Sequence, residues 1–310
     1  MRPIQFFLFL LILAAAAHAD TFSGLGGVAE IEFVTIGDPG NPADTTGAPN
    51  PAGAVDYEYR IGKYEISEAV YYSVVGTGGP PIVGTDLPMT NIRWYFAAQF
   101  VNSLNQIKGY PSAYKGIGSR DGLQLWSSGD PGYDPANPYR NRQAFYFLPS
   151  ADEWYKAAYY DPATGVYYDY ATGSNDLPDG IDFAGDPDFE TVRADNYSPA
   201  GPNDVTNAGL LSPYGTMGQT GNVVEWEETA FDLTNDSAVE ARGARGGAWF
   251  ETDQWLDAGR RGQGAPNQAY DWVGFRVASR APVPEPGAAA IGLWAAVALS
   301  AAARRGRVTA

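Results

Sequence analysis

The sequence predicts a single domain that mixes short helices and short strands, and three observations carry this prediction. The chain of 310 residues contains 37 glycines, 23 prolines and 20 tyrosines, which favours short elements joined by turns over a helical bundle. Residues 55–61 alternate apolar and charged side chains, which is typical of a half-buried strand. Residues 90–106 carry apolar side chains near a spacing of 3.6 residues, which predicts an amphipathic helix packed on the core.

The other elements follow from local patterns along the chain. A strand is predicted over residues 31–36, followed by a Pro/Gly-rich loop over 37–53. Ser150 and Glu153 have the spacing of a capping box, so a second helix is expected to begin there. Residues 161–221 show little periodicity, which predicts a long loop region held by something other than regular structure, with bound calcium as one candidate. Short strands are expected at 223–226, 246–249 and 274–278.

The N-terminus has the pattern of a secretory signal peptide. Arg2 precedes an apolar run over residues 6–17, and Ala17-His18-Ala19 then forms a small-x-small cleavage site. We therefore expect residues 1–19 to be removed before Asp20 and the protein to be exported. The working domain would then be residues 20–282.

The C-terminus resembles the bacterial PEP-CTERM sorting tail. Val283-Pro284-Glu285-Pro286 comes before an apolar stretch over 287–303, which is just long enough to span a bilayer as a helix, and three arginines follow directly. The resemblance over 283–310 implies an exosortase as processing partner and transient anchoring by the helix. The protein would then lie at the cell surface or in the extracellular matrix of a bacterium. A plain C-terminal anchor is the alternative.

The predicted domain is strongly acidic. Without Arg2, Arg304, Arg305 and Arg307 it keeps 16 of the 20 basic residues, and without Glu285 it keeps 35 of the 36 acids, so its net charge is −19. This balance excludes nucleic acid as a partner, because phosphate binding needs a basic surface. It fits the binding of hard cations, and it fits simple solubility equally well.

Two residue types are missing from the predicted domain, and their absence restricts the possible chemistry. Cysteine does not occur, and the only histidine, His18, lies within the predicted signal peptide. A thiol nucleophile, a Ser-His-Asp triad, a disulfide and the usual zinc and iron sites are therefore excluded. Calcium, which binds to oxygen ligands, is the most natural metal for such a composition.

Ordered motifs across most of the chain resemble the formylglycine-generating enzyme, or sulfatase-modifying factor, family. They are "GKYEIS" (62–67), "MTNIRWYFAAQFVNSLN" (89–105), "FLPSADEWYKAA" (147–158), "GNVVEWEE" (221–228) with "RGGAW" (245–249), and "GFRVAS" (274–279). The resemblance spans about residues 30–280. It implies a mixed α+β fold that is poor in regular structure, is C-type-lectin-like and often holds calcium.

Active members of that family oxidise a sulfatase cysteine with copper held by two cysteines. The resemblance places those two cysteines at Glu251 and Leu256, and a nearby family serine at Ala248. Copper(I) needs soft thiolate ligands, which glutamate and leucine do not supply. We therefore expect no copper, no formylglycine-generating activity and no catalytic residue of that family.

The family's main calcium loop matches this sequence better. The resemblance implies three backbone carbonyl ligands and one carboxylate ligand, at Gly218, Gly221, Val223 and Glu225. Glycines permit the bent backbone that such a site requires. The alternative is that residues 221–222 are simply a turn and that Glu225 is a buried ion-pair partner.

A second calcium site of the family would begin at Asn196 and Tyr197. The loop that follows differs in length, so Asp204 is only a candidate for its carboxylate. Elsewhere, "GFR" is expected to be structural, with Arg276 in a buried salt bridge.

The position of the family's active site predicts a ligand groove, although its catalytic residues are missing. The residues expected there are Ala248, Glu251, Trp255, Leu256 and Arg260. Trp249 is expected in the core, whereas Trp255 and Trp272 could stack on a ligand.

Two hypotheses about function follow from this groove. The favoured one is a calcium-stabilised binding or matrix module for an extracellular polysaccharide or polypeptide. The alternative is an enzyme with different chemistry, such as a hydrolase that uses a carboxylate pair drawn from Glu251, Asp253 and Asp257.

Overall fold

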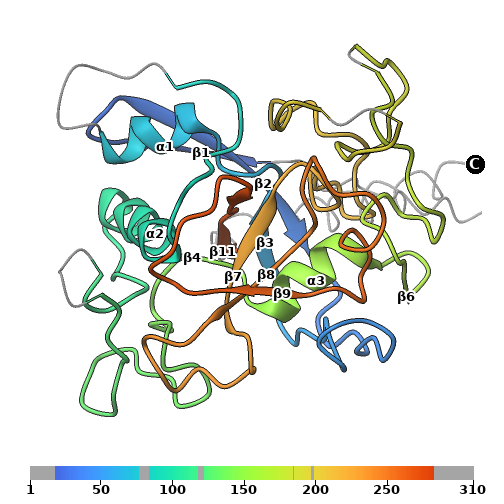
Figure 1. Cartoon of the computed structure of the whole chain (residues 1–310). Coiled ribbons are helices and arrows are strands. Elements are labelled where there is room, and N and C mark those ends of the chain that lie inside the picture. The colour runs from blue at the N-terminus through green and yellow to red at the C-terminus, as the bar shows by residue number, and fades with distance from the viewer. Residues whose placement is uncertain (1–17, 77–83, 118–121, 184, 197–198, 283–310) are drawn as a thin grey trace, which may run out of the picture. The chain divides into compact units, whose positions relative to one another are not determined.

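The computed structural model describes residues 18–76, 84–117, 122–183, 185–196 and 199–282. The apolar stretch 287–303, the sorting tail and all but two residues of the predicted signal peptide lie outside these ranges. Among the described residues, no helix has the length and apolar character needed to cross a membrane. Figure 1 shows most of the strands close together, with long connecting loops around them.

The first sheet has five antiparallel strands in the order β1-β2-β3-β11-β4. They are β1 (His18–Ser23), β2 (Val28–Ile36), β3 (Tyr59–Gly62), β11 (Ala278–Arg280) and β4 (Tyr146–Phe147). The strand expected at 31–36 is confirmed and begins three residues earlier. The strand expected at 55–61 is shorter than predicted, because Val55 binds the Asn41 side chain and the Gly40 amide instead of a neighbouring strand.

The second sheet has four strands in the order β10-β7-β8-β9. They are β10 (Val273–Gly274), β7 (Val224–Ala230), β8 (Arg242–Arg245) and β9 (Gly262–Gly264), and only the β10–β7 pair is parallel. The prediction of a strand at 246–249 is wrong. Gly246 and Gly247 have φ of 99° and 74°, so the chain turns away as soon as β8 ends.

The strand expected at 274–278 is divided between the two sheets. Gly274 ends β10 in the second sheet, whereas Ala278 begins β11 in the first. Phe275 and Val277 lie between them and are fully buried. A continuous apolar segment in the sequence is therefore a crossing point between two sheets.

In the part of the chain that the structure describes, three helices accompany the sheets: α1 (Glu68–Val75), α2 (Trp94–Lys108) and α3 (Ala151–Tyr159). The amphipathic helix predicted at 90–106 is α2, which ends at Gly109 in the left-handed conformation. The predicted capping box of α3 is confirmed, because the Ser150 hydroxyl accepts from the Glu153 amide and the Glu153 carboxylate accepts from the Ser150 amide.

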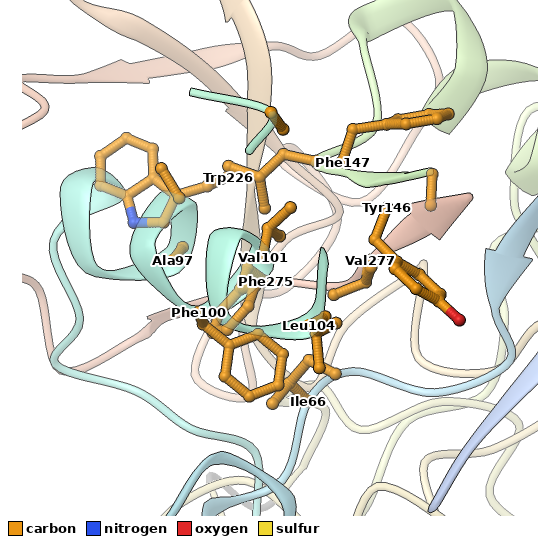
Figure 2. Packing of buried hydrophobic residues seen from close by; sticks show 14 of the residues in the cluster. Ile66, Ala97, Phe100, Val101, Leu104, Tyr146, Phe147, Trp226, Phe275 and Val277 are labelled. Atoms are coloured by element: carbon orange, nitrogen blue, oxygen red, sulfur yellow. The ribbon is translucent and has the colours of Figure 1, made fainter. Parts of the chain in front are cut away.

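The main core forms where α2 packs against both sheets. Figure 2 shows Ala97, Phe100, Val101 and Leu104 of α2 beside residues of the sheets and their connections, with Phe275 close to Phe100. The rings of Phe100 and Phe275 are 5.5 Å apart and meet edge to face. Fully burying each large apolar side chain contributes about 1.5–3 kcal/mol, so this contact holds the β10–β11 crossing in place.

The described residues between 161 and 221 are irregular, as expected, except for the hairpin of β5 (Tyr160–Asp161) and β6 (Val166–Tyr167). Isolated bridges connect parts of this region, such as Thr191 with Gly209. Ile181, Val192 and Ala208 of this region form a small buried cluster. Long-range backbone pairing and this second small core therefore hold a segment that has few regular elements.

Candidate functional site

A pocket of about 230 Å³ opens beside the second sheet. Its walls are formed by β7, β8, β9, the segment after β8 and the segment before β10. Its lining residues are Val224, Trp226, Ala244, Arg245, Gly247, Glu251, Trp255, Arg260, Gly262, Gln263, Gly264, Tyr270, Trp272 and Val273.

Three of the five predicted groove residues line this pocket, and two do not. Glu251, Trp255 and Arg260 belong to the lining. Ala248 and Leu256 are completely buried and do not line it. Leu256 packs directly against Gly247, where an added Cβ would come within 2.5 Å of the leucine side chain. The apolar leucine thus lies beneath the pocket, where it supports the left-handed Gly246-Gly247 turn.

Aromatic side chains form the exposed part of the pocket. Trp255 is 48% exposed and Trp272 is 38% exposed. The rings of Tyr270 and Trp272 are 5.4 Å apart, so they form one continuous aromatic surface. Trp249, expected in the core, is half-buried and packs against the Ile181 cluster. Large exposed aromatic faces at the mouth of a pocket offer stacking area to a ligand.

The polar groups of the pocket are few and of mixed charge. Glu251 accepts a hydrogen bond from the Ala248 amide at 3.1 Å, and burial raises the pKa of its carboxyl. The Arg260 guanidinium is exposed and makes no hydrogen bond or ion pair with any residue that the structure describes. Gln263, which was not predicted, adds an amide that can both donate and accept.

The carboxylate pair required by the hydrolase hypothesis is not assembled in the pocket. Asp253 and Asp257 are absent from the lining described above, which contains one carboxylate, Glu251. The Asp253 side chain accepts from Thr252, and the Asp257 side chain accepts from the Gly259 amide. Both aspartate side chains are therefore engaged in local contacts outside the pocket.

A buried ion-pair cluster supports the wall of the pocket. Glu227 lies between Arg245 at 2.6 Å and Arg261 at 2.8 Å, and both arginines are almost completely buried. The Arg245 guanidinium also lies 5.0 Å from the ring centre of Tyr155. Burial alone would lower the pKa of the Arg245 guanidinium, but the neighbouring Glu227 carboxylate keeps the pKa of Arg245 above its ordinary value. Sequence reasoning missed this cluster, because its members are separated by up to 34 residues and share no local pattern.

The predicted calcium loop has the bent backbone that was expected. Gly218 and Gly221 have φ of 77° and 85°. The carbonyl oxygens of Gly218, Gly221 and Val223 accept no hydrogen bond from the described parts of the chain. Their free lone pairs fit the carbonyl ligands that a hard cation prefers.

Glu225 is already engaged in a salt bridge. Its Oε1 accepts from Arg276 Nη2 at 2.5 Å, and its Oε2 accepts from Arg276 Nε at 2.6 Å and from Trp154 Nε1 at 2.8 Å. The expected buried salt bridge of Arg276 is therefore present, and Glu225 is its partner. Calcium ligation by Glu225 stays a prediction, and it would have to compete with the arginine.

A second carboxylate, which was not predicted, lies beside this salt bridge. Glu65 is 3% exposed, and its Oε1 accepts from the Asn222 side chain at 3.0 Å. Its Oε2 is buried without a hydrogen-bond partner among the described residues. Burial, with the neighbouring Glu225 charge, raises the pKa of Glu65 to about 8. The calcium loop thus has free carbonyls and one free carboxylate oxygen, which together fit a hard cation.

The second predicted calcium site gains no support. Asn196 and Asp204 are exposed, and Tyr197 lies outside the described residues. In the part of the chain that the structure describes, no three His, Cys, Asp or Glu side chains are placed together as a metal cluster.

Comparison with known proteins identifies the family. The model of the "Sulfatase-modifying factor enzyme 1-like domain" matches residues 33–281, which is most of the chain. The chain belongs to this family. Its fold, with few helices and curled sheets, is accordingly the fold of the formylglycine-generating enzymes. No curated protein matches the sequence.

Solved structures resemble this family member in fold alone. "Treponema denticola variable protein 1" is 20% identical, with a TM-score of 0.58, and the match covers 85% of this chain and 99% of that chain. CarF is 17% identical, with a TM-score of 0.56, and the match covers 81% of this chain and 99% of that chain. Identities this low support the family fold and say nothing about ligands.

Proposed function

We propose that this sulfatase-modifying factor family member is an exported binding module whose pocket recognises an extracellular polysaccharide. The observation that carries the proposal is the lining of the pocket, where exposed aromatic faces surround one carboxylate, one free guanidinium and one amide. Sugar rings stack on aromatic faces, and their hydroxyl groups both donate and accept hydrogen bonds. Trp255 and Trp272 would stack on the sugar rings, and Glu251 would form hydrogen bonds with the hydroxyl groups.

The composition of the pocket supports binding over catalysis. Glycoside hydrolysis uses two carboxyl groups on opposite sides of the bond that is cleaved. Glu251 has no such partner in the lining of this pocket. The copper oxidation of the family has no support either, because Glu251 and Leu256 occupy its cysteine positions and Leu256 is buried beneath the pocket.

Calcium belongs to the proposal as a structural ion. The carbonyls of Gly218, Gly221 and Val223 would hold it beside the salt bridge of Glu225, and it would supply positive charge to a domain with an excess of acids. We also retain three expectations from the sequence: export through residues 1–19, exosortase processing of the PEP-CTERM-type tail, and a relationship of the fold to C-type lectins.

The test is binding of the full chain to an array of bacterial polysaccharides and peptides, followed by affinity measurements with the best ligand. Trp272→Ala should weaken binding at least about fivefold, because truncating a stacked tryptophan typically costs more than about 1 kcal/mol. Phe96→Ala is the matched control, since Phe96 is 46% exposed on α2 and does not line the pocket.

Two outcomes would contradict the proposal. If Trp272→Ala and Phe96→Ala bind equally well, the pocket is not the binding site. Selective capture of peptides would instead favour the polypeptide alternative.

A further inference from the structure

We propose that Glu65 is the anionic ligand of a cation site closed by residues 218–223, and that Glu225 serves that site only by anchoring Arg276. This inference rests on the calcium binding included in the proposed function. It places the charged ligand, Glu65, in a segment that is distant in sequence from the family's calcium loop but adjacent to that loop in space. The ligand class is a hard divalent cation, because the available donors are all oxygen atoms.

The first argument is the position of Glu65. The segment that holds it is fixed by backbone hydrogen bonds from Ile66 to Phe275 and from Met89 to Ile66, at 2.9 Å and 2.8 Å. Its carboxylate lies against Gly218, where an added Cβ would come within 2.7 Å of Oε2. Only glycine leaves this space open, and its φ of 77° turns the chain around the carboxylate.

The second argument is the charge balance. Glu65 and Glu225 are both buried and interact, and Arg276 is the cation placed near them. The Nε–Nη2 edge of that guanidinium binds Glu225, at 2.6 Å and 2.5 Å, and its remaining hydrogen bonds go to the backbone carbonyls of Gly62, Lys63 and Met217. A negative charge on Glu65 would thus have no ionic partner, and a buried unpaired charge is costly. A bound divalent cation would remove that cost.

The third argument is the supply of other ligands. The carbonyls of Gly218, Gly221 and Val223 accept no hydrogen bond from the described chain. The Asn222 amide donates to Glu65 Oε1, which orients the carboxylate and leaves Oε2 as its free atom. One carboxylate oxygen, several carbonyls and water can together complete the six to eight oxygens of a calcium site.

The experiment is a calcium titration of the full chain, followed by thermal unfolding and by equilibrium dialysis. At a calcium concentration a hundredfold above Kd, the melting temperature of the wild type should rise by on the order of 5 °C. Glu65→Gln should lose most of that rise and bind calcium at least tenfold more weakly. Glu30→Gln, an exposed glutamate on β2, removes the same charge and should respond like the wild type.

Two results would overturn the proposal. If the wild type does not respond to calcium, the cation site does not exist. If Glu65→Gln responds like the wild type, the site exists without Glu65, and only this inference fails.

A second measurement covers the case in which Glu65→Gln does not fold. Tb³⁺ binds to calcium sites, and a nearby tryptophan sensitises its emission. Trp154 can do this here, because its indole donates a hydrogen bond to Glu225 beside the proposed site. Wild-type protein should show sensitised emission that calcium displaces, and emission without displacement would contradict the proposal. Polysaccharide binding by the same samples is scored separately, since Trp272 lines the pocket and does not belong to this cluster.

Discussion

Two buried clusters in the molecule each set two glutamates against one arginine, and they differ in how the carboxylate oxygens are satisfied. In the first, Arg140 contacts Glu153 at 2.8 Å and Glu228 at 2.7 Å. In the second, Arg276 contacts Glu225 at 2.5 Å, and Glu65 lies beside the pair. We refer to them as the Arg140 cluster and the Arg276 cluster.

The Arg140 cluster is complete in hydrogen bonds. Tyr57 and the Ser150 amide donate to Glu153 at 2.6 Å and 2.7 Å, and Tyr114 and Asn137 donate to Glu228 at 2.7 Å and 2.5 Å. Burial alone would raise the pKa of Glu153, but Arg140 and these donors hold it below the ordinary value.

The Arg276 cluster has the same ratio of charges but one oxygen, Glu65 Oε2, with no donor among the described residues. The pKa of Glu65 is accordingly raised, to about 8, by burial and by Glu225. The comparison teaches that this fold can neutralise two buried acids with one arginine when neutral donors surround them. Where those donors are missing, a carboxylate oxygen is left without a hydrogen bond, and this is the atom that we propose as a cation ligand.

The largest expected effect comes from breaking the complete cluster. Arg140→Ala should lower the free energy of unfolding by about 3–5 kcal/mol, because it leaves two buried carboxylates without their counter-charge. Urea denaturation of the variant measures this loss. Arg142→Ala, at an exposed arginine two residues away, should change little, and an equal loss in both variants would contradict the assigned role of Arg140.

The next effect separates the two acids of the Arg276 cluster in the presence of chelator. Glu225→Gln should cost about 2–3 kcal/mol, because it removes a charged hydrogen-bond acceptor from buried Arg276 and Trp154. Glu65→Gln should not lower stability under the same conditions, because it removes a charge that has no partner. Equal destabilisation by the two substitutions would show that Glu65 is paired in solution.

The smallest expected effect lies at the border of the Arg140 cluster. Ser150→Ala should cost about 1 kcal/mol through loss of the α3 N-cap. The Ser150 amide still donates to Glu153, so the cluster itself should stay intact. Thermal unfolding measures this loss of stability. A loss as large as that of Arg140→Ala would mean that the Ser150 hydroxyl stabilises the Arg140 cluster as well as the start of α3.

Sequence reasoning succeeded where the determining contacts are local. The helix α2 follows from apolar spacing within a single segment, and the α3 cap follows from two residues three positions apart. It failed at 246–249, where an apolar-looking segment begins with two left-handed glycines, and at 274–278, where one segment serves two sheets. In both places long-range packing outweighed the local pattern.

The residues of the candidate site likewise divide into those that the sequence predicted and those that it did not. Glu251, Trp255 and Arg260 were predicted from their positions relative to the family motif, and Trp272 was a candidate for stacking. Arg245 belongs to the "RGGAW" motif but was not predicted to line the pocket. Gln263 and Tyr270 carry no local signal, and they reach the pocket because β9 pairs with β8 and the ring of Tyr270 packs against Trp226 of β7. Ala248 and Leu256 were misplaced because a motif gives chain position without burial.

The sequence by itself determined much of the chemistry that this domain lacks, since a chain without cysteine and with a single histidine excludes thiolate sites, and sites that need two or more imidazoles, in any fold. It also determined α2, α3 and the loop-rich character, because these depend on neighbouring residues, whereas α1 was not predicted. Only the tertiary structure decided which buried acids are neutralised. Asn222 and Glu65 are 157 positions apart, and Arg276 and Glu225 are 51 apart, so their pairing depends on packing that no local pattern records.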